Sequence, residues 1–147
     1  MLEDYIHFIF TQSQMEKECL IIALLYIERV LFSVSSSSFH SSTFTFYLTS
    51  LNWRSFIMSA LLVSSKTWDD FSMVNSDYVS ILVNHEKSKC VDVASTLRPF
   101  SSPSAYLNVA RVNDLEAKFL ALIGFNICVT GEDYARVYFR ITVGKLW

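Results

Sequence analysis

The segment from Leu51 to Asp70, LNWRSFIMSALLVSSKTWDD, constrains the fold more than any other part of the chain. Its apolar residues first recur at helical spacing and then become continuous over 60–63, which predicts a helix enclosed by neighbours on most sides. Small residues beside this run would let other helices approach closely; they are Ser59, Ala60, Ser64 and Ser65. A helix of this kind must be covered by other elements, so it is expected to lie at the centre of the fold.

A lysine ends the apolar part of this helix, where Lys66 is followed by Trp68, Asp69 and Asp70. Three explanations for a cation at this place are open. The ammonium group could interact with the negative end of the helix dipole, form a salt bridge inside the domain, or meet a carboxylate on a partner protein.

Apolar residues at helical spacing predict further helices around the central one. The expected ranges in chain order are 3–11, 15–32, 50–68, 73–83, 105–123 and 132–143. Ser102 or Ser104 is expected to cap the helix at 105–123, Gly124 to end it, and Thr130 to cap the last helix. Since the chain has only three glycines and two prolines, sheets built on tight turns are disfavoured. We therefore predict an all-α fold.

The 147 residues fit one domain, 1–147, in which two polar segments stand apart. The segment at 33–49 is rich in serine, and the segment at 84–104 is polar and contains both prolines. Because loops of this length are rare in compact domains, we interpret both segments as loop insertions. Ser35–Ser38 are candidate phosphorylation sites, since this part of the first insertion is expected to be exposed.

The composition favours a protein that covers a partner. Hydrophobic residues make up 52% of the chain and the mean hydropathy is +0.33, which is more apolar than a small covered core requires. The net charge of −2 gives no electrostatic footprint for nucleic acid. The apolar run Cys19–Ile27 is too short for a bilayer, which takes ~20 residues, and the start of the chain lacks the basic region of a signal peptide.

The three cysteines are widely spaced and contain no C-x-x-C pair. This pattern predicts that Cys19, Cys90 and Cys128 are reduced thiols in a cytoplasmic or nuclear protein, with Cys19 and Cys128 packed in the core.

Catalytic residues are few. His7, His40 and His85 lie far apart without cysteines or carboxylates at ligand spacing, so no metal site is predicted. The chain contains no phosphate-binding loop and no G-x-S-x-G elbow. Asp69 and Asp70 lie at a helix end, where a turn or cap is expected in place of acid–base catalysis. The chain is therefore predicted not to be an enzyme and to need no cofactor.

Three charged residues are embedded in apolar helices: Glu28, Lys66 and Glu116. One such residue would be interpreted as a solvated position on a helix face. Three in separate helices favour a shared role, in which a buried Glu28 braces Lys66 and the lysine head shares a surface rim with Glu116. Because buried ion pairs contribute little net stability, specific recognition is the better reason for them.

Three segments together resemble the cyclin box: MEKECLIIALLYIERVL, LNWRSFIMSALLVSSKTWDD and NDLEAKFLALIGFNICV. The resemblance covers residues 5–32, 48–83 and 107–141. It is closest to the cyclin Y branch, through NW-x-x-x-x-x-x-A-x-L-x-x-SK-x-WDD and E-x-x-FL-x-L-x-x-FNI-x-V, followed by YA-x-x-YF, and next to the yeast phosphate-pathway cyclins. The implied fold is a cyclin-box five-helix bundle around a central buried helix, plus a C-terminal helix.

The resemblance also implies a function and the residues that perform it. Cyclins are not enzymes; they bind and activate a cyclin-dependent kinase by docking on its αC helix. The kinase-facing residues of the family fall on Lys66, Glu116, Leu120, Phe125 and Ile127.

The family also has an acidic residue that supports the kinase-facing lysine, and it falls on Glu28 in this chain. The arginine that usually accompanies it in the first helix is missing here. By alignment, His7 is the nearest residue to that position.

The implied partner is a PFTAIRE/PCTAIRE-like or phosphate-pathway-like kinase, and the chain is expected to be a monomer or a heterodimer with the kinase. The alternative is a cyclin-fold scaffold that binds proteins without activating a kinase, for which the charge of Lys66 would not matter. Cyclin Y relatives carry an N-terminal lipidation signal, but Leu2 stands where myristoylation needs glycine. Membrane association is therefore expected only for a longer form with a lipidated N-terminus.

Overall fold

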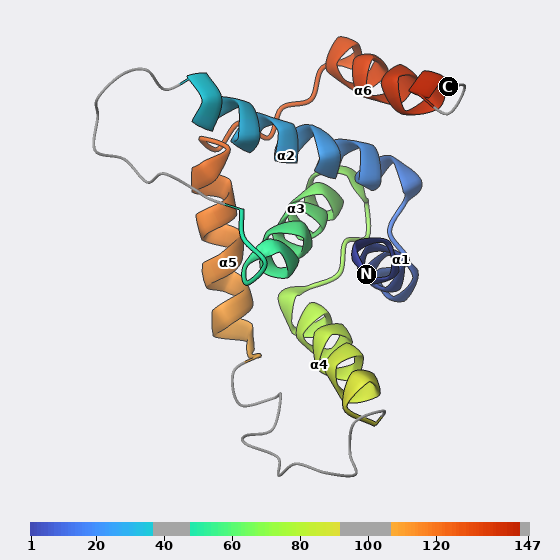
Figure 1. Ribbon diagram of the computed structural model, residues 1–147, viewed down its shortest axis with the longest axis vertical. Helices are drawn as coiled ribbons and strands as arrows, with labels where there is room; N and C mark the ends of the chain where they lie inside the picture. Colours follow the sequence, from blue (N-terminus) through green and yellow to red (C-terminus); the bar gives the residue numbers. More distant parts are fainter. Residues whose placement is uncertain (37–47, 92–106, 145–147) are drawn as a thin grey trace.

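The computed structural model describes residues 1–36, 48–91 and 107–144, and these ranges contain helices and no strand. The helices of the described residues follow one another as in Figure 1: α1 (Leu2–Ser13), α2 (Lys17–Ser36), α3 (Trp53–Trp68), α4 (Asn75–Val91), α5 (Val109–Leu122) and α6 (Gly131–Val143). The predicted all-α class is confirmed. None of these helices combines the length and the apolar character needed to cross a membrane, as far as the described residues go.

Helix α3 is the centre of the bundle. Phe56 and every residue from Met58 to Ser65 are buried. The helix packs most extensively against α2 and α5 and also contacts α1, while α4 packs against α1 and α5. Figure 1 shows α3 between these helices, with α6 lying along the outer side of α2. A five-helix bundle around a central buried helix, plus a C-terminal helix, is therefore the architecture that the described residues form.

Three serines of α3, Ser59, Ser64 and Ser65, are buried and have hydrogen-bond partners. Ser64 Oγ donates to the Leu61 carbonyl at 2.9 Å, and Ser65 Oγ donates to the Leu62 carbonyl at 3.1 Å. Ser65 Oγ also lies 2.9 Å from the hydroxyl of Tyr78 on α4. Because small side chains that bond to their own helix need no extra space, the neighbouring helices can approach α3 closely.

Two helices extend into segments that were predicted to be loops: α2 continues to Ser36 and α4 continues to Val91. The loop prediction was wrong there. On α4, His85 is buried, and its ring lies 5.3 Å from the ring of Tyr5 and 4.6 Å from the ring of Phe8, both on α1. Packing against α1 thus outweighs the polar local sequence. Within the two proposed insertions, residues 37–47 and 92–104 lie outside the described residues.

The N-cap predicted from the sequence differs from the observed one for α5 and agrees with it for α6. Helix α5 begins later than predicted because Asn108 caps it, with its side chain accepting the backbone N–H three residues further on at 2.8 Å. The serines predicted for this role, Ser102 and Ser104, lie outside the described residues. Thr130 caps α6 as predicted, since its hydroxyl accepts the Asp133 backbone N–H at 3.1 Å.

The two cysteines that were predicted to lie in the core differ. Cys19 is buried, and its Sγ donates to Asp69 Oδ1 at 3.2 Å. Burial, followed by this hydrogen bond, raises the pKa of the Cys19 thiol to about 12. Cys128 is exposed, so the prediction was wrong for this residue. It lies in the extended segment after α5, where Arg29 binds its backbone carbonyl and the side chain stays at the surface.

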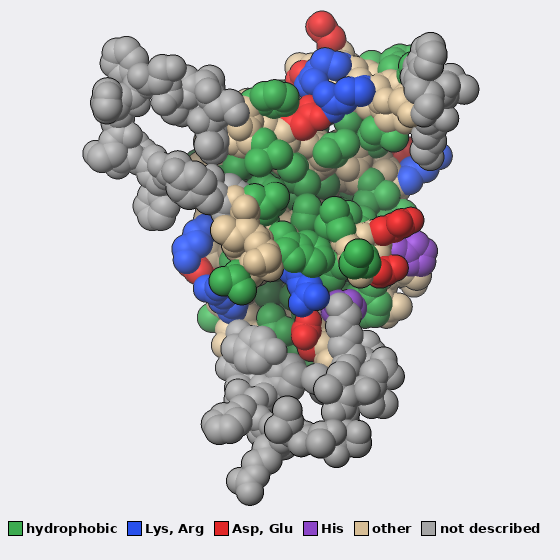
Figure 2. All heavy atoms as spheres, in the orientation of Figure 1, with side chains coloured by type: hydrophobic (Ala, Val, Ile, Leu, Met, Phe, Trp, Pro, Cys, Tyr) green, Lys and Arg blue, Asp and Glu red, His purple; other side chains and the backbone are tan. Residues whose placement is uncertain are grey.

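Some of the large apolar residues of the chain remain exposed at the surface. Figure 2 shows hydrophobic side chains gathered across the middle of one face, over the region of α3, with charged side chains mostly around them. Large apolar residues are exposed on several elements, among them Leu51, Phe71, Phe125 and Phe139. This surface agrees with the expectation that the protein covers a partner.

Candidate functional site

Lys66 lies in the last turn of α3, where it meets Glu116 of α5. Its Nζ donates to both carboxylate oxygens, at 2.7 Å to Oε1 and 2.9 Å to Oε2. The lysine side chain is 31% exposed and the glutamate side chain 19%, so the pair lies at the edge of the surface. Two of the three explanations for this lysine therefore hold: it lies at the negative end of the helix dipole, and it forms a salt bridge inside the domain.

A third helix supports this pair through Asn75, the first residue of α4. Its Nδ2 donates to Glu116 Oε2 at 2.7 Å and to Asn113 Oδ1 at 2.6 Å. The carboxylate of Glu116 is thus held by an ammonium group from α3 and an amide from α4. Since charge-assisted hydrogen bonds are short and directional, these contacts fix the carboxylate in one place. We call the three side chains Lys66, Glu116 and Asn75 the Lys66–Glu116 rim.

The chain leaves α5 through two residues with positive φ, Gly124 at 61° and Phe125 at 56°. The first is the glycine that was predicted to end the helix. For a residue with a side chain, this left-handed conformation costs roughly 1–2 kcal/mol. The Phe125 N–H donates to the Leu120 carbonyl at 2.8 Å, which closes the turn. Phe125 is left 68% exposed, and a strained residue that is so open to solvent suggests a functional role.

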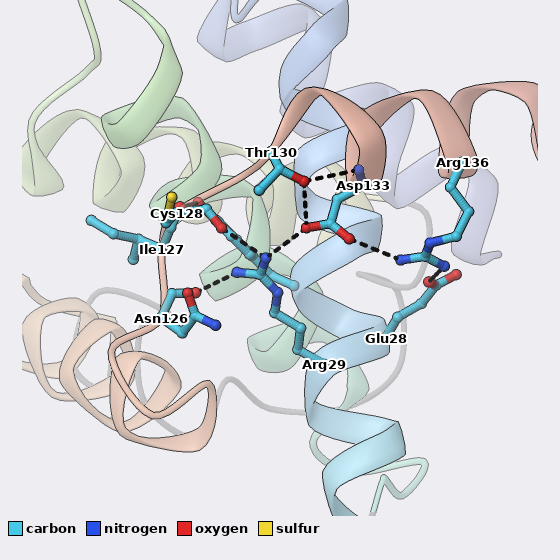
Figure 3. A network of polar contacts seen from close by, with 9 residues as sticks. Glu28, Arg29, Asn126, Ile127, Cys128, Thr130, Asp133 and Arg136 are labelled. Carbon is cyan, nitrogen blue, oxygen red and sulfur yellow. Dashed lines mark hydrogen bonds and ion pairs between the residues drawn. The ribbon is translucent and has the colours of Figure 1, made fainter.

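The segment after this turn is held on α2 by its backbone. Tyr26 Oη donates to the Ile127 carbonyl at 2.8 Å. Arg29 donates to the carbonyls of Asn126 at 2.5 Å and Cys128 at 2.7 Å, as Figure 3 shows. Because backbone carbonyls make these contacts, the side chain of Ile127 is not used to anchor the segment, and it is 44% exposed.

Glu28 does not brace Lys66 as the sequence suggested. Its carboxylate pairs with Arg136 at 3.4 Å and with Arg140, both on α6; the pair with Arg136 appears in Figure 3. The reason is that α6 packs along α2 and places two arginines one turn apart against this carboxylate. Lys66 is held by Glu116 instead.

The sequence also suggested roles for Leu120 and His7 in this site. Leu120 is only partly exposed because it packs against the core, so the exposed apolar groups of the site are Phe125 and Ile127. His7 lies on the exposed face of α1. Among the described residues, no hydrogen bond or ion pair joins its side chain to Glu28 or to the rim, so it does not replace the missing arginine.

Three residues that build the site were not predicted: Tyr26, Arg29 and Asn75. In the sequence, Arg29 marks only the end of an apolar run. A tyrosine and an arginine one turn apart in such a helix could have indicated a polar anchor. Arg29 also pairs with Asp133 of α6 at 3.6 Å, a contact that no local pattern reveals. Asn75 has no local signal, since asparagine at the start of a helix normally serves as a cap.

A family model described as Cyclin matches residues 1–82, which is more than half of the chain. The chain belongs to the cyclin family. The match spans α1, α2, α3 and the first part of α4, while α5 and α6 lie beyond it. No solved structure matches the chain. Cyclin domains are regulatory modules without a catalytic site of their own, and protein kinases are their general partners.

Proposed function

We propose that this chain binds and activates a cyclin-dependent kinase, in the manner of the cyclin Y branch, by docking on the αC helix of the kinase. The observation that carries the proposal is the Lys66–Glu116 rim, a charge pair fixed by three helices and left partly exposed. Leu120 lies one turn after Glu116 on the same face of α5, and its carbonyl binds the Phe125 N–H. The rim is thereby continuous with the exposed Phe125.

The chemistry of this surface suits a protein partner. Stable interfaces combine aromatic and aliphatic anchors with polar groups around them. Here Phe125 and Ile127 supply the anchors, and the rim supplies fixed charges beside them. The ammonium group of Lys66 has three N–H donors and two acceptors within the pair, so it retains a donor for a partner's carbonyl or carboxylate.

The proposed activation depends on a difference in affinity between two positions of the kinase αC helix. A partner that binds the inward position of the αC helix more tightly than the outward position shifts the kinase toward its active state. In that state the αC glutamate pairs with the lysine that positions the ATP phosphates. The rim and the turn at Phe125 are already ordered by internal hydrogen bonds, so docking requires little further ordering of the cyclin.

The kinase class is proposed from the motifs that resemble the cyclin Y branch and the yeast phosphate-pathway cyclins. These motifs contain both Lys66, with the WDD sequence that follows it, and the FNI sequence at 125–127. Kinases of the PFTAIRE/PCTAIRE-like and phosphate-pathway-like classes are therefore the proposed partners.

A kinase assay with purified proteins tests the proposal. The chain is mixed with kinases of the two classes. Complex formation is measured by gel filtration, and kinase activity is measured as the rate of phosphoryl transfer to a peptide. We expect a complex with at least one kinase and a higher kcat/KM in its presence. Phe125→Ala should weaken the complex, whereas Leu51→Ala should not, since Leu51 is 94% exposed and lies at the opposite end of α3.

The outcomes separate the two function classes. A chain that forms the complex without changing the kinase rate would contradict activation and favour the non-activating scaffold. A chain that binds none of the kinases, or binds them equally well after Phe125→Ala, would contradict docking through this surface.

A further inference from the structure

A row of aromatic rings runs from the end of α3 onto α6. The ring centroids of Trp68 and Tyr134 are 6.4 Å apart with their planes at 12°, and those of Tyr134 and Tyr138 are 6.3 Å apart at 13°. We call Trp68, Tyr134 and Tyr138 the aromatic row. The three rings are nearly parallel and come from two helices that are far apart in the sequence.

Tyr134 packs against the hydrophobic core, but core packing does not account for Trp68 and Tyr138. Trp68 is 47% exposed and Tyr138 is 44% exposed, and Val137 is the buried residue of α6. Single aromatic residues at a surface are ordinary, whereas rings aligned across two helices form a contiguous apolar patch. The indole N–H of Trp68 donates to Glu16 Oε2 at 3.2 Å, which fixes the ring before any partner arrives.

Carboxylates border the aromatic row. Glu16 accepts the indole hydrogen bond, and the Glu16 backbone N–H donates to Asp69 Oδ1 at 3.3 Å, so both acids lie at the Trp68 end. Glu18 lies close enough to Tyr134 to help raise the pKa of its phenol, after the larger effect of desolvation. Lys17 contributes one positive charge in the same turn of α2, so the net charge of this group of side chains is negative. We call Glu16, Glu18 and Asp69 the acidic border.

This surface is separate from the Lys66–Glu116 rim. Lys66 and Trp68 are two residues apart on α3, which places their side chains about 200° apart around the helix. Their contacts confirm the separation, since Lys66 meets α5 and Trp68 meets α6. A partner on the aromatic row could therefore bind at the same time as a kinase on the rim.

We propose that the aromatic row and the acidic border form a docking surface for an arginine-bearing peptide segment of a partner protein. A guanidinium group is planar and always charged; it stacks on the faces of Trp and Tyr rings and forms bidentate pairs with carboxylates. The acidic border disfavours acidic or phosphorylated segments. Rings that are held in place by neighbours lose little side-chain freedom on binding, which suits a short segment.

Fluorescence anisotropy with the full chain tests this surface. The probe is a short labelled peptide with several arginines separated by glycine and proline, compared with the same peptide carrying glutamine in place of arginine. We expect the arginine peptide to bind at least about tenfold more tightly. Tyr138→Ala should weaken its binding about fivefold, which corresponds to one cation–π contact. Glu18→Gln should weaken it about threefold and reduce its salt dependence.

Two control variants test whether peptide binding depends on the aromatic ring and on this surface. Tyr138→Phe keeps the ring and should bind like the parent chain, while Phe125→Ala changes the kinase-facing surface and should leave peptide binding unchanged. Equal binding of the glutamine peptide would overturn the proposal. So would Tyr138→Phe binding as weakly as Tyr138→Ala, or a Tyr138→Ala chain that binds like the parent.

Discussion

Reversing the charge of Lys66 separates the stability role of the rim from its docking role. Lys66→Glu removes an ion pair whose side chains are 31% and 19% exposed and places a second carboxylate beside Glu116. A partly exposed pair contributes up to about 1 kcal/mol to the free energy of unfolding. For a chain of this size, that loss lowers Tm by about 2–4 °C, so the variant should still fold.

The effect on kinase binding should be much larger. Removing one partner of a charge pair that becomes buried in an interface costs about 2–5 kcal/mol, which is a loss of affinity of at least about 30-fold. The double variant Lys66→Glu/Glu116→Lys restores an ion pair inside the domain. It should recover the parent Tm to within about 2 °C, yet it should not recover kinase binding, because both charges that we propose to face the kinase are reversed.

The assays are urea unfolding for stability and kinase activation for docking, applied to the parent chain and the two variants. The reasoning would be refuted if the double variant regained activation together with stability, since the rim would then act only through the fold. Normal activation by the single variant would refute the docking role of Lys66 directly.

Three further predictions follow from other parts of the site. Phe125→Gly removes the cost of a positive φ, so the free energy of unfolding should not fall, while kinase affinity should fall about tenfold or more. A stability loss above about 1 kcal/mol would contradict the strain argument. Glu28→Gln weakens the ion pairs that hold α6, so the α6 amides should exchange hydrogen about fivefold or more faster, with the α3 amides as the internal control. Unchanged α6 exchange would show that these pairs do not hold the helix. Because burial raises the pKa of the Cys19 thiol to about 12, iodoacetamide at pH 8 should modify the exposed Cys128 and spare Cys19, as read by peptide mass spectrometry. Similar labelling of both cysteines would contradict the packing of Cys19.

The sequence was informative about the fold because its strongest signal belongs to the central element. The continuous apolar run at 60–63 could only be covered by other helices, and the structure encloses it with α1, α2 and α5. The extension of α4 was missed because it depends on tertiary packing. His85 lies in a polar local sequence, and its burial against α1 cannot be inferred from that sequence.

The site was predictable where charge stands out against an apolar background, as for Lys66 and Glu116. It was not predictable where partners come from distant segments. Glu28 pairs with Arg136, which lies 108 residues further along the chain, and no periodic pattern relates the two. Tyr26 and Arg29 act through backbone carbonyls at 126–128, and a carbonyl acceptor leaves no mark in the sequence.

The central claim is that the surface around Phe125 and the Lys66–Glu116 rim docks on the αC helix of a kinase. Site-specific photo-crosslinking tests it most directly, with a benzophenone amino acid placed at position 125 and, in a second variant, at position 138. With the kinase that the binding assay selects, we expect position 125 to crosslink to the αC helix and position 138 to give no crosslink there. Crosslinks from position 125 to other parts of the kinase, or αC crosslinks from position 138, would contradict the account.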